Sequence, residues 1–570
     1  MTGFNIERLP FDSQAINTWG QADEKHANWP VVYTISSSKE IYIGETVNAA
    51  SRMHQHLGVP ERRALERVQI IKHDRFNKSA CLDLESHLIK YFAADGKYKV
   101  LNGNLGLSDS NYFDRDLYRE SFKDLFELLV EEGFLSRPVP EIVNSDLFKY
   151  SPFKTLNSDQ AIALTGILER LFSDLAGSRD DELVVRGEPG TGKTIIAIYL
   201  IKLLKDIGRY LPDELAASDS IFSEYFTVKN KELMAGLTVG LVIPQQSLRR
   251  TVQKVFASVP GLNSSQVMSP FDLGKSKEPY DLIIVDETHR LGQRANQSSA
   301  QQNKDFKEIN EKLFGEDKLE TTQLDWIRKQ SRKRILLLDA GQSVRPADLP
   351  SIKIHELTRA AKTRDALFNL SSQMRVKGGN DYLTFVSSLF EPNPKKAEKF
   401  GTYDLRFFGS FVEMRKQIIE KNKQFGLGRL LAGFAWPWNS KKDKSKHDIE
   451  IEDVKLFWNG TATDWINSKG SSEEVGGIHT VQGYDLNYAG VIIGSDLKFD
   501  TVTQRIIFDR NCYFDTKGKE NNDKLGLKYS DEDIRQFVIN IYKVLLTRGI
   551  QGTYVYVVDP PLRKYLSQFF

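Results

Sequence analysis

One segment limits the possible folds of this 570-residue chain more than any other. The apolar run 183–186 is followed by Gly187-Glu-Pro-Gly-Thr-Gly-Lys-Thr194 and then by IIAIYLIKLL, which has the composition of a buried helix. The eight residues match G-x-x-x-x-G-K-[ST] in the strand–loop–helix context that this motif requires. The segment therefore predicts a phosphate-binding loop at the carboxyl edge of a parallel sheet.

The residue types of this loop suit the phosphates of a nucleotide. Gly187, Gly190 and Gly192 allow backbone N–H groups to turn toward a phosphate without a Cβ in the way. Lys193 supplies a positive charge to the β- and γ-phosphates, and the Thr194 hydroxyl can bind Mg²⁺. We therefore predict that ATP and Mg²⁺ bind here.

A second motif places two acids at the end of a strand. Four apolar residues lead from Asp281 directly into Asp286 and Glu287. Parallel strands end at a common edge, so both carboxylates should lie near the phosphate loop. Asp286 is the expected second Mg²⁺ ligand beside Thr194, and Glu287 would orient or deprotonate the attacking water. Together the two motifs predict an NTPase.

From about residue 155 onward, short apolar runs alternate with helical segments. Besides 183–186, the runs are 239–243, 281–285, 334–339, 429–435, 489–494 and 553–558. Continuous apolar strands separated by helices are typical of parallel sheets that are covered on both faces. The region is too long for one doubly wound sheet, so we predict an α/β fold with two lobes.

Composition excludes several classes of protein. The chain has 78 Lys+Arg against 76 Asp+Glu, a net charge of +2, so bulk charge does not hold nucleic acid and any such contact must be local. Two cysteines cannot build a disulfide framework or a zinc cluster, which indicates a reducing compartment. No signal segment and no apolar run of membrane length is seen, so we expect a cytoplasmic protein without membrane contact.

Further segments resemble the motifs of superfamily 1 helicases in their order along the chain. They are TLNSDQAIAL (155–164), LLLDAGQSVRP (336–346), SQMRV (372–376), HTVQGYD (479–485) and VLLTRG (544–549). The resemblance implies that Gln160, which precedes the loop, reads adenine and that Gln342 senses the γ-phosphate. It also implies that Arg375 and Arg548, from the second lobe, complete the site. The charge of the transition state gives a physical reason for such arginines.

The resemblance narrows to one group. Three segments together look like the Schlafen-group-3-like P-loop helicase domain of bacteria, and the resemblance covers about residues 155–570. The segments are LAGFAWPW (431–438), 476–497 and DETHR (286–290). This resemblance implies two RecA-like lobes that bind ATP and move on nucleic acid.

Residues 28–106 resemble a different family, the GIY-YIG nucleases. Tyr33 lies in VVYTI, Tyr42 in IYIGET, Arg52 and His56 in SRMHQHL, and Glu85 in LDLESHLIKYF. Arg52 and His56 are four residues apart, so they share one face of a helix. The resemblance implies a small α+β domain with two tyrosines on a hairpin, an arginine and a metal-binding glutamate.

In such a site Glu85 would hold one Mg²⁺ or Mn²⁺ ion, and Arg52 would neutralise the scissile phosphate. A tyrosine or His56 would help to deprotonate water, and the sequence leaves that choice open. Asn102 or Asn104 matches an asparagine that closes many of these sites. Two departures are Val31, where the family has glycine, and Glu45, where one branch has lysine.

These observations predict a GIY-YIG domain over 1–106, a connector over 107–150, and two RecA-like lobes over 151–350 and 351–570. The expected function is an ATP-dependent nuclease–helicase that acts on DNA, with RNA left open, in bacterial antiphage defence or DNA processing. The alternative is a nucleotide-gated sensor or assembly ATPase whose N-terminal domain binds or cuts nucleic acid without unwinding it.

Overall fold

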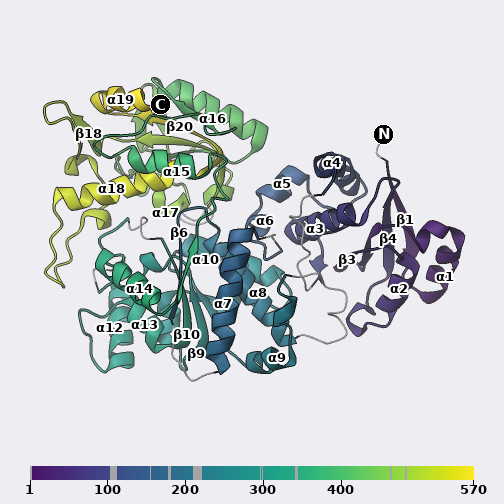
Figure 1. The fold of residues 1–570 in the computed structure, drawn as a ribbon. Coiled ribbons are helices and arrows are strands. Elements are labelled where there is room, and N and C mark those ends of the chain that lie inside the picture. Colours follow the sequence, from purple (N-terminus) through teal and green to yellow (C-terminus); the bar gives the residue numbers. More distant parts are fainter. Residues whose placement is uncertain are drawn as a thin grey trace. The chain divides into compact units, whose positions relative to one another are not determined.

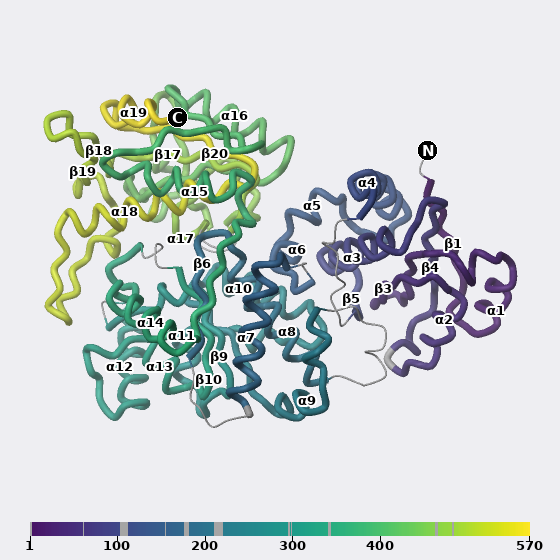
Figure 2. Tube along the Cα trace, viewed as in Figure 1, coloured from purple at the N-terminus to yellow at the C-terminus, as the bar shows by residue number. Residues whose placement is uncertain are grey.

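The structure is a computed structural model that divides into two compact units. It describes residues 3–102, 112–153, 156–176, 182–209, 221–294, 297, 299–339, 344–461, 465–481 and 484–570. Unit 1 comprises Met1–Thr165, Ile195–Gly236 and Val252–Ser265; unit 2 comprises Gly166–Thr194, Leu237–Thr251 and Gln266–Phe570. Figures 1 and 2 follow the chain through the elements of both units.

Unit 1 contains a five-stranded sheet with the order β1-β4-β2-β3-β5. Its strands are β1 (Phe4–Pro10), β2 (Val31–Ser36), β3 (Glu40–Thr46), β4 (Arg67–His73) and β5 (Lys99–Val100). The neighbours pair antiparallel except β3 and β5, which are parallel. The hairpin predicted from the β-branched runs 31–35 and 41–43 is confirmed as β2–β3.

Helices lie between the strands of this sheet or follow them along the chain. They are α1 (Ser13–Ala22), α2 (Ala49–Leu57), α3 (Lys78–Asp95), α4 (Arg115–Glu131), α5 (Val139–Asn144) and α6 (Asp146–Lys149). In α3, Asn77 caps the N-terminus by accepting from the Ala80 N–H, and Gly96 ends the helix with a left-handed φ of 75°. The residues of the predicted connector are tied to α3, because Arg119 of α4 donates to Asp83 at 3.0 Å.

The first sheet of unit 2 has six strands, all parallel, in the order β11-β6-β10-β9-β7-β8. They are β6 (Glu182–Gly187), β7 (Val239–Val242), β8 (Val267–Met268), β9 (Tyr280–Val285), β10 (Ser331–Leu338) and β11 (Leu367–Leu370). Figure 1 labels β6, β9 and β10 of this sheet. Since β6, β9 and β10 are neighbours and parallel, the residues that follow them meet at one edge.

The second sheet of unit 2 has five parallel strands in the order β12-β20-β17-β13-β16. They are β12 (Asp404–Phe407), β13 (Gly428–Ala432), β16 (Val475–Gly477), β17 (Leu486–Ile493) and β20 (Gly549–Val557). The tube in Figure 2 shows β17 beside β20. The predicted fold class is thus confirmed: two doubly wound parallel sheets follow a smaller α+β sheet.

The remaining elements complete both units. Helices α7 (Ser158–Ala176), α8 (Lys193–Arg209) and α10 (Gln246–Ser258) have residues in both units. Unit 1 also has α9 (Val228–Met234). The other helices of unit 2 are α11 (Pro270–Lys275), α12 (Ala300–Phe314), α13 (Gln323–Lys329), α14 (Ser351–Thr363), α15 (Gly379–Ser388), α16 (Phe411–Phe425), α17 (Ile478–Val481), α18 (Asp531–Leu546) and α19 (Pro560–Leu566). Two hairpins, β14–β15 (Ile449–Ile451, Val454–Leu456) and β18–β19 (Leu497–Asp500, Arg505–Phe508), are inserted between them. In the described part of the chain no helix is long and apolar enough to cross a membrane.

Candidate functional site

The phosphate loop between β6 and α8 depends on its glycines. Gly190 and Gly192 have φ of 85° and 84°, in the left-handed region that other residues rarely adopt. A Cβ on Gly190 would also collide with the Gln373 side chain, and one on Gly187 would collide with the Thr191 hydroxyl. Gly187 and Gly192, which the motif reserves for glycine, and Gly190, at one of its variable positions, thus all lie where a Cβ would collide or the backbone would be strained.

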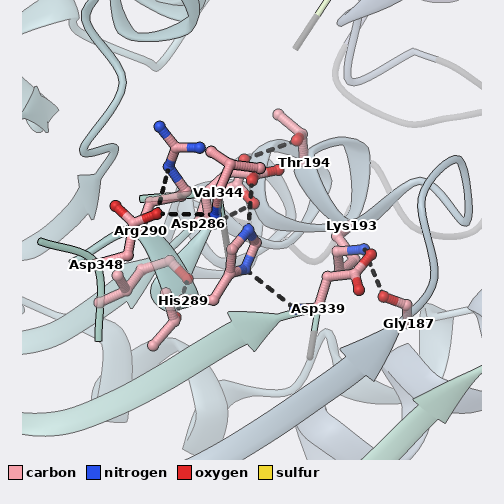
Figure 3. A network of polar contacts seen from close by, with 12 residues as sticks. Gly187, Lys193, Thr194, Asp286, His289, Arg290, Asp339, Val344 and Asp348 are labelled. Atoms are coloured by element: carbon pink, nitrogen blue, oxygen red, sulfur yellow. Dashed lines mark hydrogen bonds and ion pairs between the residues drawn. The ribbon is translucent and has the colours of Figure 1, made fainter. Parts of the chain in front are cut away.

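Lys193 opens α8 and is 7% exposed. Its Nζ donates to the carbonyl oxygens of Gly187 at 2.6 Å and Glu188 at 2.9 Å, and it lies 3.6 Å from Asp339 Oδ2. These contacts hold the ammonium group beside the loop, close to where a phosphate bound by the loop would lie. Figure 3 shows Lys193 between Gly187 and Asp339.

Thr194 and Asp286 meet across the same edge of the sheet. The Thr194 hydroxyl donates to Asp286 Oδ2 at 2.6 Å (Figure 3). Asp286 Oδ1 accepts from the Glu287 N–H at 2.9 Å. No group of three or more His, Cys, Asp or Glu side chains that could hold a metal ion by themselves occurs among the described residues. A hydroxyl and one carboxylate, without a protein cage, fit Mg²⁺, which usually takes its other ligands from phosphates and water.

The two neighbouring acids have opposite pKa shifts. Burial and the charge of Glu287 raise the pKa of Asp286, and the Thr194 hydroxyl only partly opposes this. Burial also raises the pKa of Glu287, but His289, Lys193 and Arg290 outweigh it and lower that pKa overall. Glu287 is therefore ionised at neutral pH and can accept a proton from water. Its φ of 52° is a left-handed conformation, as found at functional sites.

The segment that contains Arg375 lies directly on the phosphate loop. The Gln373 amide donates to the Pro189 carbonyl at 2.7 Å, and the Met374 N–H donates to the Gly190 carbonyl at 3.0 Å. The Arg375 side chain forms an ion pair with Asp485. The predicted arginine thus stands beside the loop.

Arg548 follows the last helical turn of α18 and is 2% exposed. Its guanidinium donates to the carbonyl oxygens of Val544 at 3.1 Å and Tyr484 at 3.3 Å. In this arrangement Arg548 ties α18 to the segment before β17, a structural contact that the motif did not indicate.

The two predicted glutamines stay predictions. Gln342 lies outside the described residues. Gln160 belongs to unit 1, where its side chain accepts from the Asn157 N–H at 3.2 Å and its own N–H donates to the Asn157 side chain at 2.7 Å. These bonds stabilise the start of α7.

A cavity of about 440 Å³ lies beside the start of the loop, within the size range of ligand pockets. It is lined by Glu188 and Pro189 of the loop and by Asp339, which follows β10. Asn540 and Lys543 of α18 also line it. Sequence reasoning missed the two α18 residues, whose only signal was their place one and two turns before Arg548.

In unit 1, Tyr33 of β2 is fully buried and pairs in register with Gly44 of β3. A Cβ on Gly44 would collide with the phenol ring of Tyr33, so the close approach requires glycine. The Tyr33 hydroxyl lies 2.7 Å from His56 Nε2, and the Tyr42 and His56 rings are 4.9 Å apart. The hairpin and α2 thus bring these three side chains together.

Arg62, which the sequence did not single out, contacts this cluster. Its guanidinium donates to His56 Nδ1 and lies 3.9 Å from the centre of the Tyr42 ring. Because guanidinium only donates, Nδ1 must accept, and Nε2–H then donates to Tyr33. Burial, Arg62 and Arg52 lower the pKa of His56 to about 2. With its lone pair occupied, His56 is poorly placed to act as the base.

Arg52 and Glu85 shift the pKa values of both tyrosines in opposite directions. Burial raises the pKa of Tyr33 and Tyr42, Arg52 opposes this, and the negative charge of Glu85 adds to it. Glu85, on α3, is half-buried. It presents a hard oxygen donor, which fits one divalent ion with water as its other ligands.

The other residues named at this site have structural contacts. The Asn102 side chain clamps β3, accepting from the Ile43 N–H at 3.0 Å and donating to the Ile43 carbonyl at 2.7 Å. Glu45 forms an ion pair with Lys78 at the start of α3, so a cation does stand beside the position where the family branch has lysine. Asn104 lies outside the described residues.

The fold and the loop together define a P-loop NTPase with two parallel-sheet lobes. The family model "Schlafen group 3, DNA/RNA helicase domain" matches residues 181–559, more than half of the chain. The chain therefore belongs to this family, which confirms the helicase part of the resemblance. The GIY-YIG resemblance stays a prediction.

The individual proteins that resemble this chain share little sequence identity with it. The uncharacterized protein YPL245W of Saccharomyces cerevisiae is 25% identical over 449 residues, which cover 72% of this chain and 90% of the yeast protein. The solved Pif1 helicase from Candida albicans is 11% identical with a TM-score of 0.26, and 73% of this chain and 100% of that chain are covered. The Pif1 helicase from Bacteroides in complex with ADP-AlF3 and ssDNA is 11% identical with a TM-score of 0.24, with 70% and 94% covered.

Proposed function

We propose that unit 2 hydrolyses ATP to move along or unwind DNA. The observation that carries this proposal is the contact of Thr194 with Asp286 beside an ionised Glu287. Mg²⁺ held by Thr194 and Asp286 would supply positive charge to the β- and γ-phosphate oxygens. Glu287 accepts a proton from water while the water oxygen bonds to the γ-phosphorus, the β–γ bridging P–O bond breaks, and ADP leaves with the bonding electrons.

Contacts of the SQMR segment support a motor rather than a simple NTPase. Gln373 and Met374 bond to carbonyls of the phosphate loop, and Arg375 stands next to them. These contacts couple the segment to the loop, so a phosphate that shifts the loop would also shift the segment, which is how nucleotide state could bias the second sheet. The membership in a DNA/RNA helicase family agrees with this proposal.

Two measurements test the motor. ATP turnover by the wild-type chain should rise when single-stranded DNA is added, and a labelled strand should be displaced from a partial duplex only with ATP and Mg²⁺. Turnover without displacement or translocation would favour the nucleotide-gated sensor instead. Repeating both assays with RNA of the same sequence decides between the two nucleic acids.

We further propose that the N-terminal part cleaves phosphodiester bonds. Its support is the cluster of Tyr33, Tyr42, Arg52, His56 and Glu85 on neighbouring elements of unit 1. A divalent ion held by Glu85 would stabilise the leaving 3′ oxygen. Arg52 contacts the scissile phosphate, and a tyrosine assists the attacking water.

Nicking of plasmid DNA in Mg²⁺ or Mn²⁺ tests the cutter. We expect nicking by the wild-type chain and none after Glu85→Ala. Cleavage that is undiminished in this variant would remove the site. A cutter joined to a motor suits antiphage defence or DNA processing, and this biological step rests on the combination of domains alone.

A further inference from the structure

His289 lies three residues after Asp286, in a short 3₁₀ turn (Thr288–Arg290), and its side chain is fully buried in unit 2. Neither the phosphate loop nor the metal-binding residues account for a histidine at this position. Its two ring nitrogens face residues that follow two different strands, Glu287 after β9 and Asp339 after β10. Figure 3 shows the ring beside Asp339.

The tautomer of His289 follows from one contact. Nδ1 lies 3.2 Å from the backbone nitrogen of Asp339, at the end of β10, and that N–H donates to it. A backbone N–H cannot accept, so Nδ1 carries no proton and the proton of the neutral ring is on Nε2.

The protonated nitrogen faces the proposed water-activating acid. His289 Nε2 lies 3.1 Å from Glu287 Oε2. Both atoms are buried, and in the part of the chain that the structure describes neither makes a hydrogen bond of regular geometry with any partner. Buried polar atoms without partners are costly, so Nε2–H and Oε2 are the natural partners of each other.

We infer that His289 is a positioning residue for ATP hydrolysis, which holds Glu287 through Nε2–H and leaves the other carboxylate oxygen to meet the attacking water. The inference rests on the proposed role of Glu287. The ring also links the ends of β9 and β10, because Nε2 faces Glu287 and Nδ1 accepts from the Asp339 N–H. The Asp339 carboxylate in turn lies 3.6 Å from Lys193 Nζ. The acid that activates water and the lysine that holds the phosphate are thereby kept in register.

Two substitutions separate the two ring contacts. The side-chain amide of His289→Gln reaches about as far as Nε2 and can still donate to Glu287. The shorter amide of His289→Asn reaches about as far as Nδ1, so it can keep the Asp339 contact but not the Glu287 contact. Both variants remain polar, and circular dichroism together with binding of a fluorescent ATP analogue verifies folding and nucleotide binding.

We expect His289→Gln to keep kcat within about threefold of the wild type and His289→Asn to lose about tenfold or more, with KM for ATP unchanged in both. Equal kcat values, or a change confined to KM, would overturn the inference. If the Asn variant does not fold, a Gln variant with a kcat tenfold or more below the wild type overturns it alone, whereas near-normal turnover supports it.

A double-mutant comparison separates this inference from the proposed function. In a Glu287→Gln background, His289→Asn should cause no further loss of kcat, since the acid that it positions is gone. A full additional loss would mean that His289 acts independently of Glu287. If Glu287→Gln itself leaves turnover unchanged, the proposed role of Glu287 fails; if only the histidine variants leave it unchanged, the present inference alone fails.

Discussion

The phosphate loop of unit 2 is shaped by its backbone, whereas the N-terminal site of unit 1 is shaped by side chains packed on one another. In the loop, positive φ values at Gly190 and Gly192 and N–H groups at the start of α8 create the site. In unit 1, buried Tyr33 rests on Gly44, and His56 is held between Tyr33 and Arg62.

This difference explains how each site can be recognised. A backbone-shaped loop requires fixed residues at fixed spacing, so a short motif identifies it. A side-chain cluster can be built from several combinations of residues, and a resemblance rests on order along the chain. The difference also predicts that substitutions act differently at the two sites. Activity at the phosphate loop should depend mainly on charge, and activity at the N-terminal site mainly on the hydrogen-bonded cluster of rings.

The largest expected effect concerns the lysine of the loop. Lys193→Ala removes a buried cation that is held over the loop, and we expect ATP turnover to fall by about 10²–10³-fold. DNA nicking without ATP should be unchanged. Lys304→Ala, at an exposed position of α12, is the matched control and should have no effect. Normal turnover in Lys193→Ala would remove the loop from the catalytic site.

The reciprocal change tests the N-terminal site. Glu85→Gln keeps the shape of the side chain but removes the charge that would bind a metal, so Mg²⁺-dependent nicking should fall by about 10²-fold or more. ATP turnover should stay within twofold. Glu127→Gln, an exposed acid on α4, serves as control. If Glu85→Gln slows ATP turnover as much as nicking, the two sites are not separate activities.

A smaller effect is expected at Arg375. Arg375→Lys keeps the positive charge but loses the planar fork, so kcat for ATP should fall by about tenfold while KM changes little. Arg359→Lys, on the exposed face of α14, is the control. A rise in KM with kcat unchanged would mean that Arg375 binds nucleotide in the ground state instead of stabilising the transition state.

The smallest effect is a pH dependence of stability in unit 1. The pKa of buried His56 is about 2, below its usual 6.5, so the folded state binds fewer protons than the unfolded state between these values. Stability conferred by this group is complete above pH 6.5 and is lost by about 1.4 kcal/mol per pH unit as the pH falls below it.

Urea unfolding at pH 7.5, 6.5 and 5.5 measures this dependence. The free energy of unfolding of the wild type should fall relative to His56→Gln between pH 6.5 and 5.5, and His54→Gln, at an exposed position, should behave as the wild type does. A difference between wild type and His56→Gln that does not change with pH would show that His56 titrates normally.

Sequence patterns predicted the fold class, whereas the roles of the site residues stay predictions, and the exceptions in the fold have physical reasons. Apolar runs predicted β6, β7, β9, β10, β13, β17 and β20 of the two parallel sheets, because a strand buried on both faces must be apolar throughout. The short strands β8, β11, β12 and β16 were not predicted, since none of them contains a long apolar run. Segment 300–330 is polar in composition, yet Phe306 and Trp326 form a small core of their own there. Its polar composition concealed that core, since only a few apolar residues on α12 and α13 build it.

The contacts that the sequence did not predict are those made between side chains from separate elements. Arg62 reaches His56 across a 3₁₀ turn, and His289 joins the ends of two strands. Neither contact has a fixed spacing or a required residue type. Such contacts depend on the mutual placement of elements, which local patterns do not encode.

The most direct test of the central claim is ATP-driven strand displacement by the Glu85→Ala chain, in which cleavage cannot mimic unwinding. The assay follows a labelled strand leaving a partial DNA duplex in Mg²⁺ and ATP, with the Glu85→Ala, Glu287→Gln double variant beside it. The account predicts displacement by the single variant and none by the double variant. ATP hydrolysis without displacement or translocation, or equal displacement by both chains, would contradict it.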